Sequence, residues 1–280
     1  MPQSGTSWLG MLVAQPQPRV LLQDENGSGG LAQRLIDALR REHTVLAQLM
    51  SPLSRVHEHA SALRAGMCLP VGSPEFVRAC MRAAGIDEPN WNCYPRELAS
   101  HLAGHPRKVS AAAALQWTRP AFIRPARGSA FRAFVLREEL QAMDRWEKTQ
   151  LLRLLRLPGT AAVWVSRVLP IVAEWRYYVL NGEVVGYAPS GPVSRDKSPA
   201  IGEVSSMIAA APSEGAFALD VGVLRDGSTS LLRVRDAWAV EWYPFAPEAP
   251  DPLAFLHFLW ARWSEMLLTP RRVAANSSVL

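Results

Sequence analysis

The strongest fold signal lies in AEWRYYVLNGEVVGY, residues 173–187. Two runs rich in apolar and aromatic residues, typical of strands, flank the dipeptide Asn181-Gly182, which favours a tight hairpin turn. Because side chains on a strand alternate between its two faces, Glu174 and Arg176 share one face. The stretch therefore predicts an antiparallel hairpin that carries two charged side chains on one face of an otherwise apolar strand.

A second hairpin is predicted further along the chain. FALDVGVLRDG, residues 217–227, and SLLRVRD, residues 230–236, are β-type runs joined by an Asp-Gly turn. The period of two places Arg233 and Arg235 on one face of the second strand and Asp236 on the other. Two neighbouring arginines on a strand that otherwise looks interior raise the question of what they face.

Sequence texture divides the chain into five segments. Residues 1–18 form a loose arm rich in Pro, Gln, Ser and Gly, and residues 19–118 predict a small α/β domain of strand, turn and helix units. Residues 119–247 hold most of the β-type runs and predict an α+β domain. Residues 248–270 form an apolar helix that can pack on the body of the protein or on a second copy in a homodimer, and residues 271–280 form a polar tail.

Local signals predict further elements. Ser73, followed by a proline, is a predicted helix N-cap, and residues 88–104 predict an extended stretch closed by a helix. One helix is expected near residues 137–156, and a strand is expected over residues 229–240. The GSGG run at residues 27–30 lacks the Lys-Ser/Thr ending of a phosphate loop, which favours a plain turn.

The composition favours a globular protein, because 49% of the residues are hydrophobic. The net charge is +5, but the basic residues are interleaved with acidic ones, which argues against a nucleic-acid binder. Three cysteines, Cys68, Cys80 and Cys93, fit no metal-ligand spacing and are expected to be apolar residues in a reducing compartment. MLVA at residues 11–14 is not a convincing signal peptide, and no apolar run approaches the roughly 20 residues that cross a bilayer. We therefore expect a cytoplasmic protein without a membrane partner.

An ordered set of motifs carries a family resemblance. VGSPEFVRA, YPRELASHL, FIRP, AEWRYYVLNGEVVGY and FALDVGVLRDG occur in this order within residues 65–245. Together they resemble the ATP-grasp superfamily, and most closely a bacterial and phage clade with a Glu-Trp-Arg strand. The resemblance implies an ATP-grasp-like α+β fold, preceded by a small Rossmann-like pre-ATP-grasp domain, that holds ATP between two sheets. It also implies a ligase that forms C–N or C–S bonds through an acyl phosphate, with ATP and Mg²⁺ as cofactors and a carboxylate as substrate.

The resemblance assigns roles to individual residues. Arg176 stands where the clade has a matching arginine, which implies a catalytic clamp on phosphate or acyl phosphate, with Glu174 beside it. Asp220 stands where the first metal-binding carboxylate is expected. Arg124 takes the place of a phosphate-binding lysine, and Lys108, at the boundary between the predicted domains, is a further candidate for contact with a nucleotide phosphate.

The sequence departs from the family pattern at the expected metal site. Arg233 and Arg235 stand where the resemblance predicts a Glu-x-Asn pair, and Arg167 stands where an acidic residue is usual. Replacing a coordinating anion by a cation costs roughly 4 kcal/mol at about 4 Å from the metal when the effective dielectric constant is about 20. An ion pair between Asp220 and one of these strand arginines is therefore favoured over metal binding, while Arg233 and Arg235 join the candidate nucleotide-binding residues.

Two functions remain open from the sequence. The first is an ATP-dependent ligase in which Arg124, Arg176 and Asp220 handle phosphates and metal. The second is a catalytically inactive ATP-grasp protein that binds an anionic small molecule among its arginines or serves as a protein-interaction module. For Arg176 the structural alternative is an ion pair with Glu174 on the same strand face.

Overall fold

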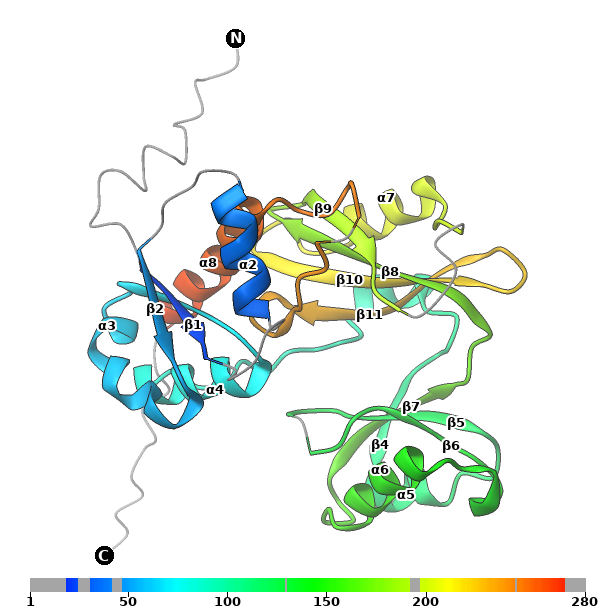
Figure 1. Cartoon of the computed structure of the whole chain (residues 1–280). Coiled ribbons are helices and arrows are strands. Elements are labelled where there is room, and N and C mark those ends of the chain that lie inside the picture. Colours follow the sequence, from blue (N-terminus) through cyan, green and yellow to red (C-terminus); the bar gives the residue numbers. More distant parts are fainter. Residues whose placement is uncertain are drawn as a thin grey trace, which may run out of the picture. The chain divides into compact units, whose positions relative to one another are not determined.

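The computed structural model of the chain describes residues 19–24, 31–41, 47–128, 130–191, 197–244 and 246–269. The arm predicted for residues 1–18 and the turn predicted at residues 27–30 lie outside this part. The chain forms two compact units, of which unit 1 comprises residues 1–89 and 236–280 and unit 2 comprises residues 90–235. Figure 1 shows mixed helices and sheets, so the α+β fold class is confirmed.

Unit 1 is built on a three-stranded parallel sheet in the order β2-β1-β3. Helix α4 begins where the sequence predicts, because the side chain of Ser73 accepts a hydrogen bond from the backbone N–H of Phe76 at 3.3 Å. The strands are β1 (Arg19–Gln23), β2 (Gln48–Ser51) and β3 (Cys68–Val71), and the helices are α2 (Leu31–Arg41), η1 (Leu53–His59), α3 (Ala60–Arg64), α4 (Pro74–Ala84), η4 (Ala237–Ala239) and α8 (Pro252–Leu268).

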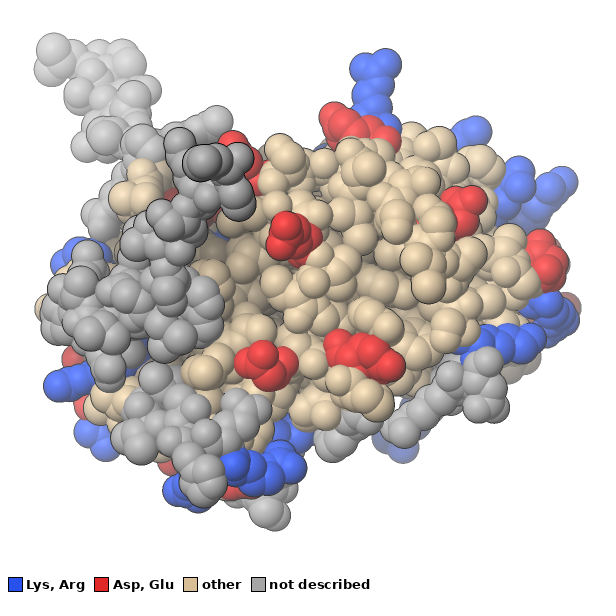
Figure 2. Space-filling model, turned by 90° about the horizontal axis from the view of Figure 1, so that it is seen from above, with Lys and Arg blue, Asp and Glu red and all other residues tan. Residues whose placement is uncertain are grey.

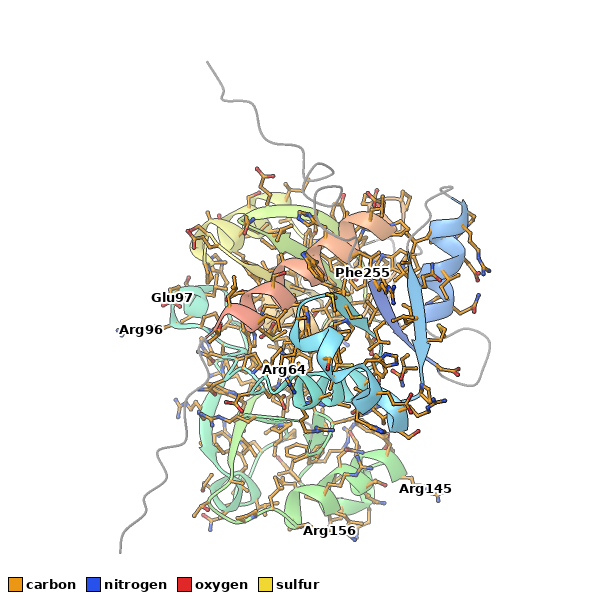
Figure 3. The ribbon with its side chains drawn as sticks, turned by 90° about the vertical axis from the view of Figure 1, so that its left-hand side faces the viewer. Arg64, Arg96, Glu97, Arg145, Arg156 and Phe255 are labelled. Carbon is orange, nitrogen blue, oxygen red and sulfur yellow. The ribbon has the colours of Figure 1, made fainter. Side chains whose placement is uncertain are left out.

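Helix α8, the apolar helix predicted near the C-terminus, buries its aromatic side chains within unit 1. Phe255, which Figure 3 labels on this helix, stacks on Trp242 and Phe258 with ring centroids 5.8 and 6.1 Å apart. From the same helix, Arg262 donates two hydrogen bonds to Asp236, at 2.7 and 2.6 Å. Asp236 is thereby paired inside unit 1, in agreement with its predicted position on the opposite strand face from the arginines.

Unit 2 contains a first four-stranded antiparallel sheet in the order β4-β7-β5-β6. Its strands are β4 (Arg107–Ser110), β5 (Ala121–Pro125), β6 (Phe134–Leu136) and β7 (Ala162–Arg167), and its helices are α5 (Ala111–Leu115), η3 (Leu140–Ala142) and α6 (Arg145–Leu155). Helices α5 and α6 pack on one face of this sheet, where Ile123, Val163 and Leu154 are fully buried. Strand alternation therefore turns Phe122 and Arg124 of β5 to the other face.

The second sheet of unit 2 has the order β11-β10-β8-β9. Its strands are β8 (Ile171–Leu180), β9 (Glu183–Pro189), β10 (Ala216–Leu224) and β11 (Thr229–Asp236), and α7 (Ile201–Ala210) and η2 (Arg96–His101) accompany it. The predicted hairpin of β8 and β9 is confirmed, and its turn residues Asn181 and Gly182 have φ angles of 50° and 79°. Gly227, in the turn between β10 and β11, has a φ angle of 86°, as an Asp-Gly turn requires.

Three predicted elements differ from the structure. The strand expected over residues 229–240 ends at Asp236, where the carboxylate pairs with α8 and η4 follows. The helix expected near residues 137–156 begins only at Arg145, because Asp144 and Glu147 form a capping box there. The helix expected within residues 88–104 is the short 3₁₀ helix η2, a common form for single turns.

The surface features of the described residues bear on possible partners. No helix among them is both long enough and apolar enough to span a bilayer. Figure 2 shows a face on which Asp and Glu side chains are scattered over a mainly uncharged surface, with Lys and Arg toward its edge. Such a face lacks the continuous basic stripe that follows a nucleic-acid backbone.

Candidate nucleotide-binding cavity and arginine cluster

Three neighbouring strands of the second sheet, β8, β10 and β11, bring the predicted charged residues together. Glu174 and Arg176 lie on one face of β8, and the strand register pairs Arg176 directly with Asp220 of β10. From β11, on the other side of β10, Arg233 and Arg235 reach the same carboxylate. Five of the seven residues singled out from the sequence therefore lie at one place in unit 2.

The centre of this arrangement is an ion cluster of one carboxylate and three guanidinium groups, here called the Asp220 cluster. Asp220 is fully buried, and its Oδ1 accepts a hydrogen bond from Nε of Arg176 at 2.8 Å. Its Oδ2 accepts hydrogen bonds from Nε of Arg233 at 2.5 Å and from Nε of Arg235 at 2.6 Å. Burial alone would raise the pKa of Asp220, but the three arginines hold this pKa well below its usual range. Asp220 is therefore an ionised partner of three cations.

The Asp220 cluster does not fit Mg²⁺. Magnesium requires a near-octahedral shell of oxygen ligands, and usually one or two carboxylates supply the protein's share. Here both oxygens of Asp220 accept hydrogen bonds from guanidinium groups, and Arg233 and Arg235 place positive charge where further oxygen ligands would be needed. Within the described part of the chain, no three His, Cys, Asp or Glu side chains are grouped so as to hold a metal ion. The donor set favours ion pairing over metal coordination.

Glu174 lies beside the cluster and outside its hydrogen bonds. Among the residues that the structure describes, no donor lies within hydrogen-bond distance of its carboxylate, and Arg176 is bonded to Asp220 instead. The alternative ion pair between Glu174 and Arg176 is therefore not formed. Burial, followed by the negative charge of Asp220, raises the pKa of Glu174 although three arginines are near.

Substitution of Glu174 by Gln is expected to raise the free energy of unfolding at neutral pH. A carboxyl group whose pKa is raised in the folded state costs stability at pH values above that pKa, and the cost disappears below the pKa of the unfolded chain. Urea unfolding of both proteins should therefore show a gain for the variant at pH 7 that vanishes at about pH 4. Glu138→Gln, which removes the same charge at an exposed position, is the control. Equal stabilities of wild type and Glu174→Gln at pH 7 would contradict the burial of an unpaired carboxylate.

A cavity of about 270 Å³ adjoins the cluster, and residues of both sheets of unit 2 line it. The first sheet contributes Phe122, Val135 and Ser166, while the second contributes Glu174 and Arg233. The volume is close to the lower end of the range for small-molecule sites, roughly 300–1,000 Å³, and the mixture of apolar walls with a few charged groups is typical of them. The cavity therefore suits a ligand with a flat apolar part and an anionic part.

Arg124 lies near this cavity with donors that are not satisfied. Its Nε and Nη1 atoms are buried and have no hydrogen-bond partner among the described residues. Its guanidinium carbon lies 5.7 Å from the ring centroid of Tyr94, which lines the cavity. Lys108, the seventh predicted residue, is exposed on β4 opposite Trp164 of β7. Buried donors without partners are costly, so an anion near Arg124 would stabilise the site.

Several residues that line the cavity had no role in the sequence analysis. Phe122 lies in the FIRP motif, and strand alternation with Arg124 could have placed it on the same face. Tyr94 could not have been found in this way, because it lies outside the strands and is brought to the cavity by tertiary contacts, including an edge-on contact with Trp164 at 4.9 Å. The cavity thus depends on the packing of segments far apart in the sequence.

Comparison with known proteins shows one family match. Residues 49–265 match a family described as an ATP-grasp domain, the third family of its clade, so that the match spans most of the chain. No curated protein matches the chain.

Solved structures of similar chains have low sequence identity. They include D-cycloserine synthetase DcsG, with 14% identity over 88% of this chain and 99% of that chain and a TM-score of 0.49. An L-amino acid ligase from Bacillus licheniformis has 10% identity over 86% and 74% of the two chains, also with a TM-score of 0.49. A RimK domain protein of the ATP-grasp type from Sphaerobacter thermophilus has 16% identity over 87% and 99%, again with a TM-score of 0.49.

Proposed function

Because the chain belongs to the ATP-grasp domain family that its sequence matches, we propose that the cavity of unit 2 binds a nucleotide without Mg²⁺. On this proposal the chain does not perform the acyl-phosphate chemistry of ATP-grasp ligases. The observation that carries the proposal is the Asp220 cluster, in which three guanidinium groups occupy both oxygens of the carboxylate. Phosphoryl transfer places developing charge on phosphate oxygens, and ligases of this kind use magnesium to stabilise it.

The charges around the cavity support an anionic ligand. Arg233 lines the cavity directly, and Arg124 holds unsatisfied buried donors beside Tyr94 at its wall. Arginine is suited to phosphate because its planar group can donate two parallel hydrogen bonds. A phosphate-bearing ligand would therefore satisfy donors that the described residues leave unpaired.

The apolar walls support a ligand with a ring system. Phe122 and Val135 of the first sheet line the cavity together with Leu231 and Leu232 of the second. Aromatic and aliphatic side chains of this kind favour a flat ring between them. A nucleotide combines such a ring with phosphates, and this combination matches both parts of the cavity.

The alternative is an ATP-dependent ligase that activates a carboxylate substrate. It is favoured by the agreement of Glu174, Arg176 and Asp220 with the pattern of the ATP-grasp clade. Catalysis would require the Asp220 cluster to open and release the carboxylate to a metal, against the attraction of three arginines. The two functions differ in whether Mg²⁺ is needed.

A thermal-shift experiment with the full chain tests the proposal. In buffer containing EDTA, millimolar ATP or ADP is expected to raise the Tm, and addition of Mg²⁺ is expected to produce no ADP from ATP. Arg124→Met is the matched variant, because it keeps an aliphatic stem near Tyr94 but removes the donors, and we expect a smaller nucleotide shift with an unchanged or higher Tm of the free protein. A Tm shift that appears only with Mg²⁺, or formation of ADP, would establish the ligase instead.

A further inference from the structure

The terminal nitrogens of Arg233 and Arg235 are not used within the described part of the protein. Each residue donates from Nε to Oδ2 of Asp220, and no other hydrogen bond of either side chain is formed with the described residues. The two side chains are 21% and 28% exposed, whereas Arg176 on the other oxygen of Asp220 is only 2% exposed. The Nη atoms of Arg233 and Arg235 are therefore available to a ligand.

The Asp220 cluster carries an excess of positive charge. One carboxylate faces three guanidinium groups, and among the described residues Glu174 is the other acid that contributes to the charge balance at Asp220 and Arg233. Burial, together with the charges of Arg233 and Arg176, lowers the pKa of Arg235 in spite of Asp220. A second anion between Arg233 and Arg235 would relieve this repulsion between like charges.

From these contacts we propose that Arg233 and Arg235 form a clamp for the terminal phosphate of a magnesium-free nucleoside di- or triphosphate. This inference rests on the proposed function and names the chemical group that the cavity recognises. Asp220 fixes the two guanidinium groups through Nε and is a positioning residue. Arg233 lines the cavity, so its Nη atoms can donate to a phosphate inside it.

The clamp has a consequence for metal dependence. Guanidinium groups and Mg²⁺ bind the same phosphate oxygens, one by hydrogen bonds and the other by coordination. A magnesium-bound nucleotide presents less negative charge and fewer free oxygens to Arg233 and Arg235. The clamp should therefore select the free nucleotide over its magnesium complex.

Calorimetric titration of the full chain in EDTA tests the clamp with ATP, AMP and inorganic pyrophosphate as probes. We expect Arg233→Gln and Arg235→Gln each to weaken binding of ATP and pyrophosphate by about tenfold or more, the usual loss for a charged hydrogen bond. AMP, which lacks the terminal phosphates, should lose much less. Arg225→Gln removes the same charge from the exposed turn between β10 and β11 and should leave all three affinities unchanged.

The outcomes separate the clamp from the proposed function. If wild type and both variants bind ATP equally well, the clamp is overturned while nucleotide binding stands. If no nucleotide binds but pyrophosphate does, and the variants lose it, the clamp stands and the proposed function fails. Arg233→Lys keeps a cation beside Asp220 without the Nη pair, and it is expected to fold like wild type and to bind pyrophosphate weakly. Unchanged pyrophosphate affinity in a folded Arg233→Lys protein would also overturn the clamp.

Discussion

Substitution of Asp220 by Asn is expected to destabilise the fold by about 3–5 kcal/mol, because removing one partner of a buried ion pair leaves its charges uncompensated. Three guanidinium groups depend on this single carboxylate, and Asp220 is fully buried. In a site built for a metal, the same substitution in the metal-free protein would relieve repulsion between carboxylates and would not lower stability. The sign of the change therefore distinguishes an ion-pair cluster from a metal site.

Urea unfolding monitored by circular dichroism measures this difference. The pKa of Asp220 is depressed in the folded state, so its contribution is present above the usual aspartate pKa and is lost as the pH falls through the depressed value. The gap between wild type and Asp220→Asn should thus narrow in strong acid. Asp226→Asn, in the exposed turn after β10, is the control and should leave stability unchanged. A stable Asp220→Asn protein at neutral pH would disprove the cluster.

The double substitution Arg233→Glu with Arg235→Asn is expected to create a binding site for Mg²⁺. It removes two cations and adds oxygen ligands beside Asp220 on the adjacent strand. Without metal the new protein should be less stable than wild type, because a glutamate in place of Arg233 adds an acid near Asp220 and Glu174. Mg²⁺ at about a hundred times its Kd should restore about 2.7 kcal/mol.

Calorimetry with Mg²⁺ and with Mn²⁺ as a probe provides the measurement for this variant. The control is Arg233→Gln with Arg235→Gln, which removes the same two cations without adding a carboxylate and should not bind metal. If the Glu and Asn variant also ignores both ions, the two arginine positions do not occupy the place of metal ligands. That result would remove the reason for regarding the cluster as a substitute for magnesium.

Strand periodicity predicted the central part of the site from the sequence. Alternation alone placed Glu174 with Arg176, and Arg233 with Arg235, on shared faces, and the turn dipeptides predicted the two hairpins that neighbour each other in the sheet. The predicted ion pair between Asp220 and a β11 arginine is present, and both arginines form it. Local rules succeed here because register in a hairpin follows from its turn.

The sequence did not predict features that depend on tertiary packing. The approach of Arg124 to Tyr94, and the cavity beside them, need segments that no local pattern connects. The end of β11 at Asp236 likewise follows from an ion pair with Arg262 of α8, 26 positions further along the chain. Such contacts decide where a strand stops and which charged group remains unpaired, and alternation along a strand carries no information about them.

Calorimetric titration of the wild-type chain with ATP, first in EDTA and then in millimolar Mg²⁺, determines whether arginines replace the metal. We expect binding in EDTA and an apparent affinity that falls when Mg²⁺ is added, because the magnesium complex offers fewer free phosphate oxygens to Arg233 and Arg235. An affinity that appears or rises with Mg²⁺ would show instead that the Asp220 carboxylate serves a metal and that the arginines do not replace it.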